Sequence, residues 1–121
     1  MTEYAVVLIG DENAWEQASD EERAAVMGRH EEFARLLGER GHVITGGAEL
    51  HSSSQTRQVR RADDGALVVT EGPYVESVEQ VGGFYTVRTD DLDDLVEICG
   101  VLADGDGAIE VRPVVEYPEA T

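Results

Sequence analysis

Histidines are the side chains best suited to proton chemistry in this chain, and one of them belongs to a regular apolar pattern. An imidazole changes charge near neutral pH, so it can act as an acid or a base. His30 shares a helical face with Phe33 and Leu37, whereas His42 begins a strand-like run and His51 follows in a loop. A histidine on such a face is either a structural residue with one hydrogen-bond partner or a pocket residue that transfers protons. His30 is therefore the first candidate for chemistry.

The stretch from Thr70 to Tyr85 supplies glutamates that could work with a histidine. Gly72-Pro73 and Gly82-Gly83 bracket it, and both dipeptides predict breaks in regular structure. One interpretation is a long connection between two strands. The other is a loop that carries side chains to the edge of a pocket, which makes Glu71 a candidate acid.

No metal or cofactor motif is recognisable. The three histidines do not have the spacing of a zinc-binding helix, and the paired glycines are too short to cradle a phosphate. Ser52-Ser53-Ser54 has no base fixed beside it, so it does not read as a nucleophile. We therefore expect no metal and no cofactor.

The charge of the chain excludes several classes of partner. Its 121 residues carry a net charge of −17 at pH 7, with nine arginines and no lysine. Nucleic acids and anionic membranes need a basic face, so neither is expected to bind. The first apolar run is too short for a signal peptide or a membrane span. Cys99 is the only cysteine and lies among apolar residues, which predicts a buried, inert thiol and a cytoplasmic location.

The first half of the chain predicts a strand followed by a long helix. The run from Tyr4 to Ile9 is continuously apolar, as in a covered central strand, and we expect a polar loop around Trp15. Ser19 and Glu22 have the spacing of a capping box, so a helix is expected over residues 20–40. Its inner face is predicted to comprise Val26, Met27, His30, Phe33, Ala34 and Leu37.

The second half predicts a hairpin and a second strand–helix–strand unit. Asp63-Asp64-Gly65 is a hairpin turn signal between strand-like segments over residues 53–61 and 66–70. A strand over residues 42–45 precedes the hairpin and is expected to end at Gly46-Gly47. The later elements are a strand over residues 84–88, a helix from Asp90 or Asp91 through Leu102, and a last strand around Ile109 to Val115.

This order of elements predicts the fold class. Two split βαβ units with a hairpin between them form a ferredoxin-like α+β sandwich, in which both helices cover one face of an antiparallel sheet. We expect one domain over residues 1–121. The second sheet face needs a cover that so short a chain does not supply, so a homodimer is expected.

Three segments of the chain resemble the YCII-related domain family, specifically the branch named for a DGPF motif. They are YAVVLIGDENAW, EGPYVESVEQVGGFY and IEVRPVVE, and the motif itself reads Glu71-Gly72-Pro73-Tyr74 here. The resemblance implies a dimeric α+β barrel with a cleft between sheet and helices, and a family reaction that is not established. It also implies an active-site pair in which His30 matches a histidine of the first helix. Asp104, or less securely Asp106, falls near the aspartate position of that pair.

Two hypotheses for function follow. In the first, the chain is a small enzyme in which His30 and an acid, Asp104 or Glu71, transfer protons on a small organic molecule in the cleft. In the second, it is a non-catalytic ligand-binding or accessory dimer, linked to transcriptional regulation through a protein partner, and His30 is structural. A pocket that holds His30 and a carboxylate would favour the enzyme.

Overall fold

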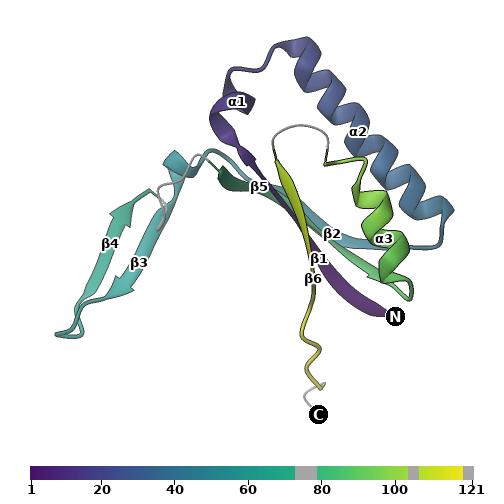
Figure 1. Ribbon diagram of the computed structural model, residues 1–121. Coiled ribbons are helices and arrows are strands. Elements are labelled where there is room, and N and C mark those ends of the chain that lie inside the picture. The colour runs from purple at the N-terminus through teal and green to yellow at the C-terminus, as the bar shows by residue number, and fades with distance from the viewer. Residues whose placement is uncertain (73–78, 104–106, 119–121) are drawn as a thin grey trace.

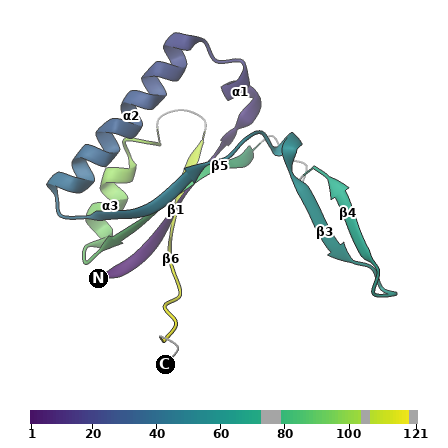
Figure 2. The ribbon, with the colours of Figure 1, turned by 180° about the vertical axis from the view of Figure 1, so that it is seen from behind.

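The sheet has the topology that the sequence predicts. The computed structural model describes residues 1–72, 79–103 and 107–118. Four antiparallel strands lie in the order β2-β5-β1-β6: β1 (Thr2–Asp11), β2 (Val43–Glu49), β5 (Glu79–Thr89) and β6 (Ala108–Pro113). Helices α2 (Asp20–Glu39) and α3 (Leu92–Cys99) lie on the same side of this sheet (Figures 1 and 2). The ferredoxin-like α+β class is thereby confirmed. No helix in the described ranges is long and apolar enough to cross a membrane.

Helix α2 begins where the capping box predicts. The Ser19 hydroxyl accepts from the Glu22 amide at 3.1 Å, and the Glu22 carboxylate accepts from the Ser19 amide at 3.4 Å. Phe33 and Leu37 are fully buried. Met27, however, is 52% exposed and Ala34 is exposed as well, so their predicted places on the inner face are wrong. At 3.6 residues per turn, Met27 points well to the side of the line through Phe33 and Leu37.

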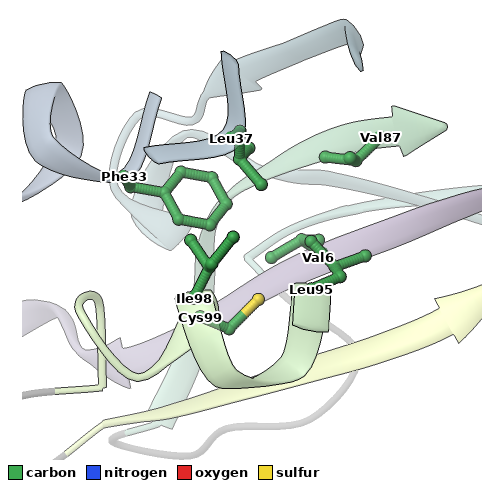
Figure 3. Packing of buried hydrophobic residues seen from close by; sticks show 7 residues of the cluster. All are labelled: Val6, Phe33, Leu37, Val87, Leu95, Ile98 and Cys99. Atoms are coloured by element: carbon green, nitrogen blue, oxygen red, sulfur yellow. The ribbon is translucent and has the colours of Figure 1, made fainter. Parts of the chain in front are cut away.

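A small core joins the helices to the two central strands. Figure 3 shows side chains from β1, β5, α2 and α3 that converge in one cluster. Its buried members are Val6, Phe33, Leu37, Val87, Leu95, Ile98 and Cys99. The expected burial of Cys99 is confirmed, and this burial raises the pKa of its thiol to about 11. The thiol is therefore protonated and unreactive at neutral pH.

The paired glycines lie inside strands, which corrects the prediction that they interrupt regular structure. Strand β2 continues through Gly46-Gly47 to Glu49, and β5 runs through Gly82-Gly83. The register between β1 and β5 shifts at Gly82, and the register between β2 and β5 shifts at Thr45, just before Gly46, as it does at β-bulges. A Cβ on Gly83 would lie 2.9 Å from the Ala48 carbonyl oxygen, so a close backbone approach requires glycine there.

The predicted hairpin forms a separate two-stranded sheet. Strand β3 (Arg57–Arg61) pairs with β4 (Leu67–Glu71), after a short 3₁₀ turn η1 (Ser53–Gln55). Gly65 has φ +85° in the connecting turn, which confirms Asp63-Asp64-Gly65 as the turn signal. Figures 1 and 2 show this hairpin extending away from the four-stranded sheet and from the helices.

Helices α1 and α3 differ from the sequence-based prediction, the first in its existence and the second in its length. Helix α1 (Glu12–Glu16) occupies the expected loop around Trp15, because the Asp11 carboxylate caps its first turn. Asp91, one of the two predicted caps, begins α3. The helix ends at Cys99, short of Leu102, although the Leu102 amide still donates to the Cys99 carbonyl at 3.0 Å. Apolar spacing alone therefore overestimates the length of α3.

Candidate functional site

His30 and Tyr85 form a side-chain pair between α2 and the sheet. The His30 Nδ1 atom lies 2.7 Å from the Tyr85 hydroxyl oxygen, within hydrogen-bond distance. Their ring centroids are 5.8 Å apart, and the Tyr85 ring lies 5.1 Å from that of Phe33. Both His30 and Tyr85 are partly exposed, in contrast to Phe33. The pair therefore lies at the edge of the core, where it is partly accessible to solvent.

Backbone register explains why Tyr85 reaches the helix. Tyr85 pairs across the sheet with Val6, a core residue, so its side chain points to the face that carries α2 and α3. Its neighbour on the other side is Gly47, which has φ +153°. A Cβ on Gly47 would lie 2.6 Å from the Phe84 carbonyl oxygen and 3.3 Å from the Tyr85 ring. A glycine at this position therefore lets β2 pass close beside the tyrosine.

Burial and charge keep both members of the pair neutral near pH 7. Burial lowers the pKa of His30; the negative charge of Glu49 opposes this effect, and the positive charge of Arg29 adds to it. Burial also raises the pKa of the Tyr85 hydroxyl. The imidazole is thus an available base, and the phenol keeps its proton.

Glu49 is the carboxylate whose charge acts on His30, and sequence reasoning missed it. It is the last residue of β2 and pairs with Gly83. Because strand residues two apart share a face, Glu49 follows Gly47 toward the helix side. The prediction that β2 ends at Gly46-Gly47 assigned Glu49 to a loop, and extending the strand through the glycines would have revealed it.

The predicted partners of His30 lie elsewhere or outside the described residues. Glu71 ends β4 in the projecting hairpin, is exposed, and lies 3.8 Å from an Arg57 guanidinium nitrogen. Asp104 and Asp106 fall outside the residues that the structure describes. Within a single chain, the hairpin carries Glu71 away from α2 (Figure 1). Among the predicted carboxylates, none is placed beside His30 by the described part of the chain.

A second polar cluster surrounds His42 and is buried. Its Nε2 lies 2.6 Å from the Asp94 carboxylate, and its Nδ1 lies 2.6 Å from the Thr89 hydroxyl. Because a carboxylate only accepts, Nε2 must carry a proton. Arg40 also contacts Asp94 from the surface. The His42 side chain is only 1% exposed, so no substrate reaches it. The cluster joins the residue before β2 and the end of β5 to α3.

A surface cavity is a further feature of the residues that the structure describes. No group of three metal-ligating side chains occurs within residues 1–72, 79–103 and 107–118. A cavity of about 470 Å3 opens beside the loop after β2, with Leu50, His51 and Val81 in its wall. His30 is not among the residues that line this cavity. The two exposed or half-exposed histidines therefore belong to different places on the surface.

The fold and the pair of His30 and Tyr85 define a small ferredoxin-like α+β protein with a histidine–tyrosine contact at the edge of its core. Residues 2–118 match the YCII-related domain, so the chain belongs to that family. An uncharacterised protein of Rhizobium meliloti (strain 1021) is 30% identical over 124 residues. That alignment covers 94% of this chain and 93% of the relative. Family membership therefore extends over nearly the whole chain.

Proposed function

We propose that this chain is a small enzyme that performs acid–base chemistry on a small organic molecule between the sheet and the helices. The observation that carries the proposal is the 2.7 Å contact between His30 Nδ1 and the Tyr85 hydroxyl at the partly exposed edge of the core. A lowered pKa makes His30 a neutral base at physiological pH. General acid–base catalysis needs such a group next to a second proton donor or acceptor.

The geometry suggests a division of roles. In the reactive tautomer, Nδ1–H donates to the Tyr85 oxygen, and the Nε2 lone pair accepts a proton from the substrate. The Tyr85 O–H then donates to the substrate oxygen on which negative charge develops. Glu49 favours the imidazolium that forms, because its charge raises the pKa of His30. Asp104 remains a proposed acid partner of His30. Glu71 also remains a proposed acid, one that the β3–β4 hairpin would have to bring to His30.

Proton exchange tests this proposal without knowledge of the natural substrate. A panel of small carbonyl acids is incubated with the protein in heavy water, and deuterium incorporation next to the carbonyl is followed by NMR. His30→Gln should slow catalysed exchange by about 100-fold or more, the usual size of a general-base contribution. His51→Gln replaces a histidine at the separate cavity and should retain the rate. Equal losses in the two variants would contradict a special role for His30.

A non-catalytic ligand-binding or accessory dimer is the second candidate. It is favoured by the cavity beside His51, which could hold a ligand without any contact to His30. His30 would then be structural, with the Tyr85 hydroxyl satisfying its ring nitrogen. Ligand binding that survives His30→Gln, together with no exchange activity in the unaltered protein, would favour this function.

We also propose that the protein is a cytoplasmic homodimer of the DGPF branch. Exposed apolar side chains support dimerisation through the sheet face that the helices leave open: Val43 is 49% exposed and Phe84 is 37% exposed. Their cross-strand partners lie on the face opposite the core. The sequence Glu71-Gly72-Pro73-Tyr74 supports membership of the DGPF branch. The single cysteine, which can form no disulfide within the chain, supports a cytoplasmic location.

A further inference from the structure

One face of the β3–β4 hairpin is apolar and exposed. The register places Val59 opposite Val69, and Leu67 two residues from Val69, so the three side chains share a face. Their exposed fractions are 60%, 55% and 56%. Arg61 stands at one end of the same face, and Arg57 stands at the other end opposite Glu71, 3.8 Å from its carboxylate. We call these six residues the arm face.

The opposite face of the hairpin has a different character. Gln58 and Thr70 lie opposite each other and form a side-chain hydrogen bond of 3.3 Å. An isolated two-stranded hairpin is only marginally stable in water, and its apolar side chains usually pack against something. Since the hairpin extends away from the body of its own chain (Figure 2), packing of the arm face calls for another molecule.

Charge identifies the kind of surface that fits. Residues 57–71 contain three arginines and three acidic residues, so the hairpin has no net charge. The net charge of −17 therefore belongs entirely to the residues outside the hairpin. On the arm face Glu71 offsets Arg57, so the apolar stripe ends in the positive charge of Arg61 and is complementary to an apolar patch with an acidic surround. Val43, Val81 and Phe84 are exposed on this acidic chain, so a second copy offers both features.

We propose that the hairpin is an arm whose face of Val59, Leu67 and Val69 packs against a second copy of this chain. Two-fold symmetry places two identical arms in one dimer, each held by the body of the other protomer. This inference rests on the homodimer proposed above and is independent of the chemistry proposed for His30. It assigns the hairpin to assembly.

Two neighbouring residues of β4 provide a matched test. Val69→Glu adds a carboxylate to the arm face, and Thr70→Glu adds the same charge to the opposite face. Both positions are exposed in the single chain, so neither change should affect folding, which circular dichroism checks. Sedimentation over nanomolar to high micromolar concentrations measures the dimer dissociation constant of the full chain. Val69→Glu should raise this constant about tenfold or more, and Thr70→Glu by less than about threefold.

Each alternative outcome overturns the arm. Equal effects of the two substitutions would mean that the arm face is not the contact. If neither substitution changes the dissociation constant and the unaltered chain is dimeric, the dimer forms through the open sheet face and the arm is not part of it. If the unaltered chain is monomeric at micromolar concentration, both the arm contact and the proposed homodimer are wrong. In none of these cases is proton exchange by His30 affected.

A second measurement locates the arm on its partner. A nitroxide is attached to Val59→Cys, since the native Cys99 is buried and its thiol has a raised pKa. This chain is mixed with isotope-labelled, unaltered chain, and the label should broaden the amide signals of a continuous patch on the labelled chain. Absence of such broadening would contradict the arm.

Discussion

Replacing Asp94 by alanine should destabilise the fold through His42. The substitution removes the acceptor of the His42 Nε2–H bond, in a side chain that is 1% exposed. A buried donor left without a partner costs about 1–3 kcal/mol. The Arg40 ion pair is also lost, but Arg40 is 42% exposed, so that loss is about 0–1 kcal/mol. Asp94 lies in the first turn of α3, where a carboxylate is favourable, so alanine regains nothing from helix propensity.

The expected net loss is about 2 kcal/mol, or about 6–10 °C in Tm for a domain of this size. Urea unfolding followed by far-ultraviolet circular dichroism measures it, provided that the slope with denaturant is unchanged. Arg40→Ala is the matched control, because it removes the surface partner of Asp94 and leaves the hydrogen bond to His42. If Asp94→Ala costs no more than Arg40→Ala, the bond between His42 and Asp94 does not stabilise the fold.

The remaining predictions concern His30, Glu49, Gly83 and Cys99. Because folding lowers the pKa of His30 from 6.5, the unfolded chain binds a proton first, so stability should fall as pH drops below about 6.5, and His30→Gln should remove that part of the slope. Glu49→Gln should lower the pKa of His30 further in an NMR titration, and an unchanged value would contradict the assigned charge effect. Gly83→Val should reduce stability by roughly 1–3 kcal/mol, because its Cβ would meet a carbonyl oxygen at 2.9 Å; an unchanged Tm would refute this. Cys99, with a pKa of about 11, should react with an alkylating reagent at pH 8 only in urea.

Local signals in the sequence predicted much of the fold. The capping box at Ser19 and the turn at Gly65 each depend on residues close together in the chain, so they could be identified without tertiary information. The position of His30 on the inner side of α2 likewise follows from helical periodicity. These features required no knowledge of which strands pair.

The partners of His30 depend on pairing that the sequence alone does not reveal. Tyr85 is 55 residues from His30, and it reaches the histidine only because β5 lies beside β1 under α2. The glycine pairs misled the prediction for a physical reason. Glycine can end a strand, but it also allows close backbone approach within one, and here Gly47 and Gly83 do the latter. Ending β2 at the glycines removed Glu49 from the face that carries His30.

The local packing around His30 outweighs the charge of the whole chain. A net charge of −17 should raise the pKa of a histidine, because surrounding carboxylates favour the imidazolium. At physiological ionic strength, however, exposed charges more than about 8 Å away are largely screened. Burial between α2 and β5 therefore dominates, and Glu49 reduces its effect without reversing it. The lowered pKa of His30 thus reflects its burial beside the Tyr85 ring, and surface acids elsewhere on the chain can change without loss of the base.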